Sequence, residues 1–167
     1  SEMCIRDSLN PIRAWKWKKI LCVSLVFLLI VSGSYMVGIG ASSSCSSWPL
    51  CKGLSIPDGM SYQVHMGHRY ISVVTLAFVG YISIELMIHA KGNKLIKRVT
   101  HSALGLLGIQ IILGAVTVWS GFSSHMKVTH LSVATLVWLS VILMSLVAEK
   151  SFSKNDLVNN VAEGKYA

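Results

Sequence analysis

The sequence predicts an all-α integral membrane protein, a four-helix bundle with both termini on the cytoplasmic side. Hydrophobic residues make up 53% of the 167-residue chain and charged residues only 13%, which is unlike a soluble domain. Apolar stretches long enough to cross a bilayer occur four times along the chain. Lys and Arg residues are concentrated on one side of these stretches, which indicates how the helices are oriented.

The four apolar stretches define the expected helices, because about 20 apolar residues span the hydrocarbon core. The length of the chain fits a single domain, which we place at residues 20–148. Residues 1–19 form a basic cytoplasmic segment, and residues 1–8 within it resemble translated adaptor sequence. Residues 149–167 are expected to form a polar, poorly ordered cytoplasmic tail. The expected membrane helices are Ile20–Gly40, Val64–Ile88, Val99–Trp119 and Val128–Ala148.

The net charge of +8 is explained by membrane topology and does not indicate a nucleic-acid partner. Twelve Lys and Arg residues fall on one side of the expected bundle, in the segment before the first helix, in the second connection and in the tail. Three fall on the opposite side. Such a bias places the basic side in the cytoplasm. We therefore expect a multi-pass protein of the plasma membrane, in contact with lipid and without bound nucleic acid.

Two cysteines lie in the first outer connection, a Ser-, Gly- and Pro-rich stretch over about residues 41–63 that is expected to be non-helical. Cys45 and Cys51 would face the oxidising compartment, which favours a disulfide over two free thiols. The pair also admits a membrane thiol oxidoreductase, but such enzymes usually relay electrons through a second cysteine pair, and Ser120–Lys127 has none. Cys22, in the first apolar stretch, is expected to be a buried and inert thiol.

Histidines lie near the start of the second and fourth expected helices. His68 and His130 fall at similar depths in helices that run in the same direction. Two neutral imidazoles that face each other at one depth could hold a b-type heme iron through both axial positions. Small residues one turn below them, Ser72 and Ala134, leave room for a flat macrocycle.

His65 and Arg69 flank His68, and each has more than one interpretation. His65 shares a helix face with His68, so it could contact a heme propionate, relay a proton or replace His68 as the ligand. Arg69 could pair with a propionate carboxylate or extend its side chain to water.

Further polar and small residues are expected to have structural roles. Gln110, at the middle of the third helix, could have a functional role, as polar residues within the membrane often do, but an interhelical hydrogen bond is the favoured interpretation. Glu85 is expected to be solvated at the inner interface. Ser102, Gly105 and Gly108 form a stripe that permits close contact between helices.

Together these residues resemble the heme A synthase family. Each of the two homologous four-helix halves in that family carries an outer loop similar to Cys45–Cys51. Each half also has a His-Arg pair similar to His68-Arg69, and a histidine at the start of its fourth helix similar to His130. Gly108–Ala115 is similar to the family's third helix, and the resemblance covers about residues 20–148.

The resemblance implies oxidation of the methyl group of heme O to the formyl group of heme A, for the assembly of terminal oxidases. Heme O would be the substrate and heme b the electron-carrying cofactor, ligated here by His68 and His130, on the outer side of the bundle with the disulfide. The substrate-binding half usually carries a glutamate where this chain has His65, so the chain is more similar to the second, heme b half.

This assignment leaves open which residue takes part in the chemistry, and His65 is the only candidate. Expected partners are a second half or a second copy of the chain, and heme O synthase. The alternative function is that of a four-helix b-type cytochrome that only transfers electrons.

Overall fold

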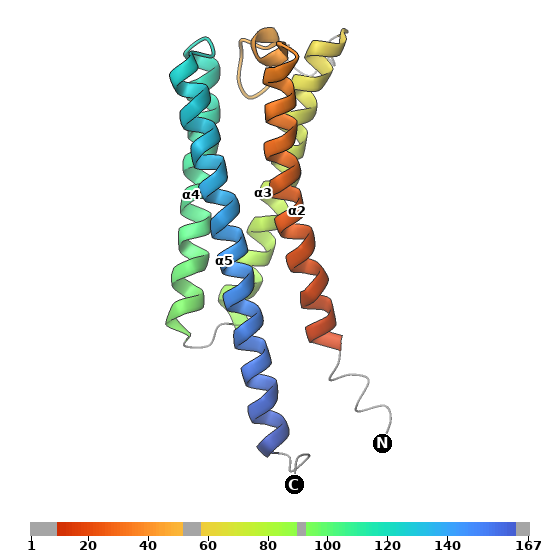
Figure 1. Cartoon of the computed structure of the whole chain (residues 1–167), viewed down its shortest axis with the longest axis vertical. Helices are drawn as coiled ribbons and strands as arrows, with labels where there is room; N and C mark the ends of the chain where they lie inside the picture. The colour runs from red at the N-terminus through yellow and green to blue at the C-terminus, as the bar shows by residue number, and fades with distance from the viewer. Residues whose placement is uncertain (1–9, 52–57, 90–92, 163–167) are drawn as a thin grey trace.

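The computed structural model describes residues 10–51, 58–89 and 93–162, and in these ranges it is an antiparallel bundle of four long helices (Figure 1). All four are long and apolar enough to cross a membrane, so the predicted all-α membrane fold is confirmed. The sidedness of the bundle stays a prediction. The elements are α2 (Asn10–Gly38), the short 3-10 helix η1 (Ala41–Ser44), α3 (Met60–His89), α4 (Lys94–Trp119) and α5 (Ser124–Ala162).

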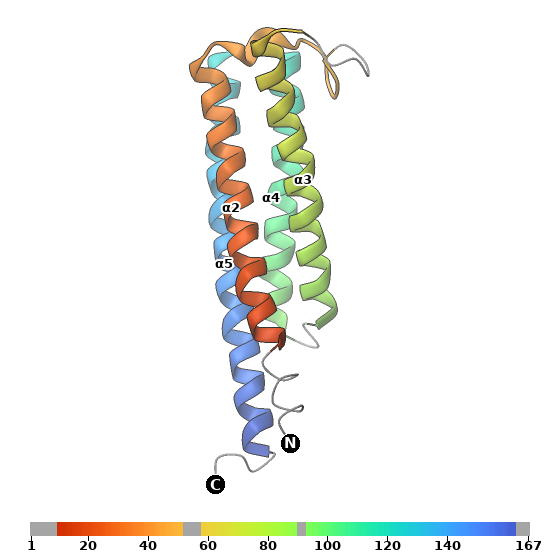
Figure 2. The same ribbon diagram turned by 90° about the vertical axis from the view of Figure 1, so that its right-hand side faces the viewer.

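The helices are arranged as a square in which each packs against its neighbours in the chain, and α2 closes the square against α5 (Figure 2). As a result α3 and α5, which carry the two predicted heme ligands, face each other across the bundle. The start of α2 and the end of α5 lie together, and we call this the terminal end (Figure 1). The opposite end carries η1 and the cysteine loop, and we call it the loop end.

The helices extend beyond the apolar stretches that predicted them. α2 begins at Asn10, α3 begins at Met60, and α5 continues to Ala162 through the segment expected to be a poorly ordered tail. The expected loop over residues 41–63 is correspondingly shorter and starts with η1. The reason is that hydropathy marks the part of a helix suited to lipid, whereas helical hydrogen bonding continues through polar residues.

Local sequence explains where several helices begin and end. Gly40 and Gly121, which follow α2 and α4, have φ angles of 72° and 65°, a left-handed conformation that glycine adopts without a steric penalty. At the start of α4, Oδ1 of Asn93 accepts hydrogen bonds from the backbone N–H groups of Leu95 and Ile96, at 3.1 and 3.2 Å. This cap satisfies donors that have no partner within the helix.

The apolar core fills the half of the bundle nearer the terminal end. α3 and α5 contribute most of its largest members, and Cys22 of α2 is fully buried within it, as predicted. Large apolar side chains on the outer faces are exposed, as expected of helices that contact lipid. The histidines lie in the other half. The core residues of α3 and α5 are Val79, Ile82, Leu86, Val137, Val141, Met144 and Ala148.

Two ion pairs join α2 to both of its neighbours near the terminal end. Nζ of Lys18 lies 2.6 Å from Oε1 of Glu85 on α3, and Lys19 pairs with Glu149 on α5. The expectation that Glu85 is simply solvated at the interface is therefore wrong, since its partly buried carboxylate has a lysine partner from another helix. Adjacent residues of one helix thus contact two different helices.

The stripe of small residues on α4 faces away from the rest of the bundle. Ser102, Gly105 and Gly108 are exposed, and a Cβ added at either glycine would meet nothing within 4 Å. In the described part of the chain, the expectation that this stripe brings helices together is wrong. The close contacts are instead made at Gly33 and Gly114, which lie beside the histidines.

Candidate functional site

His68 packs against α2, and its tautomer follows from its hydrogen bond there. Nδ1 of His68 lies 2.8 Å from Oγ of Ser32. The Ser32 hydroxyl donates its proton to the carbonyl oxygen of Leu29 at 2.8 Å. Because a hydroxyl has only one proton, Oγ must accept from Nδ1–H of the imidazole. Nε2 of His68 therefore carries the lone pair, which is the state that binds a metal.

Gly33 gives the His68 ring its space on α2. A Cβ at this position would lie 3.0 Å from Cε1 of His68, closer than side chains normally approach. The imidazole therefore packs directly on the backbone of α2. Ser32 and Gly33 together form the seat of His68, one by a hydrogen bond and the other by the absence of a side chain.

His130 has a corresponding seat on α4. Nε2 of Gln110 donates to the backbone oxygen of His130 at 3.0 Å and lies 3.3 Å from Nε2 of its ring. The predicted interhelical hydrogen bond of Gln110 is thus confirmed. One turn farther along α4, a Cβ at Gly114 would lie 3.3 Å from Cε1 of His130. Gln110 and Gly114 form the seat of His130.

The two imidazoles approach each other between α3 and α5. They lie on helices that face each other across the bundle, and both are partly buried. Since α3 begins at Met60 and α5 at Ser124, both histidines lie more than one turn inside their helices, deeper than the sequence indicated. The similarity of their depths is preserved.

Some buried polar atoms have no hydrogen-bond partner, and two of them belong to the seat of His130. Among the residues that the structure describes, Oγ1 of Thr75, Oε1 of Gln110 and Nδ1 of His130 are buried and make no hydrogen bond. Such an atom costs about 1–3 kcal/mol. Thr75 lies two turns below His68 on the same helix face. Imidazoles seated on glycines, with unsatisfied polar atoms beside them, fit an iron porphyrin. Within the same residues no cluster of acidic, Cys and His side chains could hold a bare metal ion.

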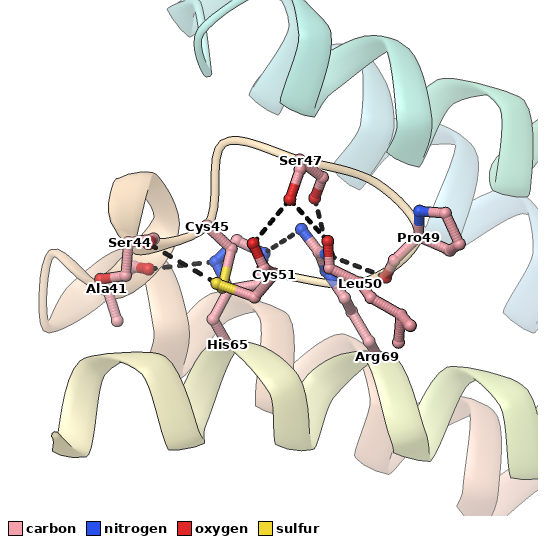
Figure 3. The surroundings of a disulfide bond; sticks show 9 residues. All are labelled: Ala41, Ser44, Cys45, Ser47, Pro49, Leu50, Cys51, His65 and Arg69. Carbon is pink, nitrogen blue, oxygen red and sulfur yellow. Dashed lines mark hydrogen bonds between the residues drawn. A yellow bond between two sulfur atoms is a disulfide. The ribbon is translucent and has the colours of Figure 1, made fainter. Parts of the chain in front are cut away.

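His65 lies nearer the loop end and has partners for both ring nitrogens (Figure 3). Its side chain is buried; Nδ1 lies 3.2 Å from the Ala41 oxygen, and Nε2 lies 3.0 Å from Nη2 of Arg69. Because arginine only donates, Nε2 accepts from Arg69 and Nδ1–H donates to Ala41. The lone pair of His65 is therefore already engaged, which favours His68 as the helix ligand.

Arg69 holds the cysteine loop against α3 (Figure 3). Its Nη1 donates to the carbonyl oxygens of Ser47 and Pro49, both at 2.8 Å. Cys45 and Cys51 are joined in a disulfide in this loop, with their Cα atoms 4.9 Å apart. The structure thus gives Arg69 a role that the sequence did not indicate, and its predicted contact with a heme propionate stays a prediction.

The second connection at the loop end also contacts this group of residues. Phe122, between α4 and α5, has a φ angle of 59°, which is rare for a residue with a side chain. Its ring meets the His65 ring edge to face, with centroids 5.7 Å apart. The cysteine loop, α3 and the α4–α5 connection therefore meet at His65.

Three residues of the seats, Ser32, Gly33 and Gly114, were not predicted to be site residues. The Ser32-Gly33-Ser34 interruption of the first apolar stretch was a signal that could have indicated the first seat. Gly114 lies in Gly108–Ala115, which resembles the family's third helix, but nothing distinguished it there, because small residues are common throughout membrane helices.

The chain is similar in sequence to known proteins over most of its length. The chain is similar to proteins named heme A synthase, with 27% identity to that of Staphylococcus epidermidis and 26% to that of Staphylococcus aureus. Each match extends over 135 residues and covers 79% of this chain but 45% of the relative. The chain therefore spans less than half the length of these relatives. A family profile described as cytochrome oxidase assembly protein matches residues 9–142. Since this match covers most of the sequence, the chain belongs to the cytochrome oxidase assembly protein family.

Proposed function

We propose that the chain is a heme A synthase-type oxidoreductase, or half of one, that acts in heme A synthesis for terminal oxidase assembly. The reaction would oxidise the methyl group of heme O to a formyl group. Family membership and the relatives named heme A synthase support the role in heme A synthesis. The observation that carries the proposal is the pair of imidazoles, His68 and His130, each seated on a glycine and carried by helices that face each other across the bundle.

In this proposal His68 and His130 would together hold one heme b. Bound heme b would supply one-electron transfer. Ser32 fixes the tautomer of His68 that leaves the Nε2 lone pair available, because Nδ1–H is already donated to its hydroxyl. Both side chains are partly buried among apolar helices, and the disulfide loop lies at the same end of the bundle.

One pair of axial ligands holds one heme, so methyl oxidation needs a second site for heme O. His65, the only candidate catalytic residue from the sequence, is engaged by Ala41 and Arg69 and gives no support for a second site. We therefore expect the 167-residue chain alone to bind heme b and to make no heme A. A homologous first half, or a second copy, would provide the substrate site, and heme O synthase would supply its substrate.

The test is to express the chain with a supply of heme O, alone and together with a homologous first half. Extracted hemes are separated by chromatography, and their side groups are identified from pyridine hemochrome spectra. We expect heme b from the chain alone and heme A only with the first half. Heme A from the chain alone would show that a half-length or self-paired enzyme is competent. If heme b binds but heme A never forms, the alternative function of a b-type cytochrome is favoured.

We further propose that the loop end faces the outside of the plasma membrane, from the distribution of Lys and Arg. Asp58 and Lys94 are exposed at opposite ends of the bundle and allow a matched test. In intact cells, an impermeant thiol reagent should label Asp58→Cys and leave Lys94→Cys unlabelled. The reverse pattern would place the histidines and the disulfide near the cytoplasm.

A further inference from the structure

Gln110 contacts the ring nitrogen of His130 that an iron would need. Its Nε2 lies 3.3 Å from Nε2 of the ring, and it is held in this direction by its 3.0 Å hydrogen bond to the His130 backbone oxygen. An amide nitrogen only donates, so the ring Nε2 accepts and the ring proton lies on Nδ1. The lone pair of Nε2 is therefore directed at a donor from the protein itself.

The same contact leaves two complementary atoms without partners. Oε1 of Gln110 is an acceptor, and Nδ1 of His130 is a donor in the tautomer just derived. Both are buried and unpaired in the described part of the chain, although their side chains touch. To pair these two atoms, the amide and the imidazole would have to rotate, which would break the amide's present contacts and release Nε2 of the ring.

We propose that Gln110 is a positioning residue that exchanges one hydrogen bond with His130 for another when heme binds. Without heme, the amide N–H engages Nε2 of His130. With heme bound, Oε1 would accept from Nδ1–H and leave Nε2 available to hold the iron. This inference rests on the proposed heme b site.

His68 shows the arrangement that His130 would reach. Its Nδ1–H is already donated to an oxygen, that of Ser32, and its Nε2 is free of any donor from Ser32. Metal-ligating histidines usually donate the other ring N–H to an oxygen acceptor, which orients the ring and makes the ligand more basic. His68 is therefore the ligand that binds first, and His130 is the ligand that must first be released.

The experiment adds heme b to the heme-free full chain in detergent and follows the absorbance with time. In the wild type, a five-coordinate, high-spin species should form through His68 and then convert to the six-coordinate, low-spin species. Gln110→Leu removes the donor and the acceptor at similar volume. The conversion should become about fivefold faster, as expected for the loss of one neutral hydrogen bond. The reduction potential should rise, because a less basic ligand stabilises ferric iron less.

Ile109→Leu is the matched control, since Ile109 is the exposed neighbour of Gln110 on α4. It should leave both the conversion rate and the potential unchanged. A purely structural role for Gln110 predicts an unchanged or slower conversion in Gln110→Leu. Either of those results, or an unchanged potential, overturns the proposal while the heme site stands. If the wild type never forms a low-spin species, the heme site fails and this inference fails with it.

Discussion

The seats of His68 and His130 make room for the imidazole in the same way, but their hydrogen bonds to the imidazole run in opposite directions. In both, the imidazole packs on a glycine of the preceding helix, Gly33 for His68 and Gly114 for His130. The polar neighbour differs, because the Ser32 hydroxyl accepts from Nδ1 of His68, whereas the Gln110 amide donates toward Nε2 of His130. One ring is held with Nε2 available and the other with Nε2 occupied.

This difference shows that two residues with the same predicted role can be prepared for it to different degrees. A glycine can make room for a ring, but it cannot choose the tautomer or the direction of the lone pair. The tautomer and the direction of the lone pair are determined by the hydrogen-bonding neighbour. The comparison can be tested by changing the ligand, the glycine or the neighbour on each side.

Removal of the ligands should have the largest effect. His68→Ala and His130→Ala should each abolish the low-spin b-type spectrum, because each removes one axial bond. His68→Ala should also lose most of the bound heme, whereas His130→Ala should keep some in a high-spin form. His65→Ala is the control and should remain low-spin with an altered potential. Absorption and electron paramagnetic resonance spectra measure these outcomes. Loss of the low-spin spectrum in His65→Ala and its retention in His68→Ala would reverse the assignment within α3.

Filling the glycines should have the next largest effect. Gly33→Ala places a Cβ 3.0 Å from Cε1 of His68, while Gly114→Ala places one at 3.3 Å from Cε1 of His130. Overpacking typically costs about 1–3 kcal/mol, so heme affinity should fall about tenfold in Gly33→Ala and less in Gly114→Ala. A heme titration measures both. Gly105→Ala, where a Cβ meets nothing within 4 Å, is the matched control and should bind as the wild type does. An equal loss at all three glycines would point to helix flexibility instead of ring contact.

Removing the acceptor of His68 should have a smaller effect. Ser32→Ala leaves Nδ1–H without its partner, so heme affinity should fall about fivefold and the reduction potential should rise. Ser140→Ala is the matched control, because the Ser140 hydroxyl makes the same local bond, to the Val137 oxygen at 2.7 Å, but contacts no histidine. Spectroelectrochemical titration measures the potential. If the two serine variants behave alike, the tautomer of His68 is not set by Ser32.

Opening the disulfide should affect the two seats least. The cysteine loop is attached to α3 through Arg69, so Cys45→Ser should lower the free energy of unfolding by about 2 kcal/mol without removing either heme ligand. Thermal unfolding measures the stability. Mass spectrometry without reductant should find Cys45 linked to Cys51. Alkylation of both thiols in freshly isolated, unreduced protein would rule out the bridge.

The sequence was sufficient for the number and type of helices, because the requirement to satisfy backbone groups in lipid leaves few alternatives to long apolar helices. It was less informative about where those helices end. Asn10 and Ala162 lie far outside the apolar stretches, in polar segments where hydropathy has no bearing on helix formation. The predicted helix was also too short at Met60, where α3 begins earlier than expected.

The candidate site was predicted only in part, because some of its features depend on a single helix and others on how the helices pack together. His68 and His130 stand out as polar residues in apolar helices, and their similar depth follows from helix geometry alone. The contact of Ser32 with His68 depends on how α2 is rotated and placed along α3, which no periodicity in one helix determines. The hydrogen bonds of Arg69 depend on the path of the cysteine loop, so only the structure could reveal them.

The ion pair at the terminal end and the hydrogen bond at the histidine together define a fixed length of α2, which acts as a spacer between these two contacts with α3. Lys18 is joined to Glu85 at one end of this spacer, and Ser32 is joined to His68 at the other. At 1.5 Å per residue, Lys18 and Ser32 are about 21 Å apart along α2. The partners of these two residues on α3, Glu85 and His68, are about 26 Å apart. The extended side chain of Lys18 spans part of the difference between these two separations. The two joints fix the axial register of the helices. One residue inserted between Lys18 and Ser32 would turn the serine by about 100° around the helix, away from the histidine, while leaving every side chain of the site intact.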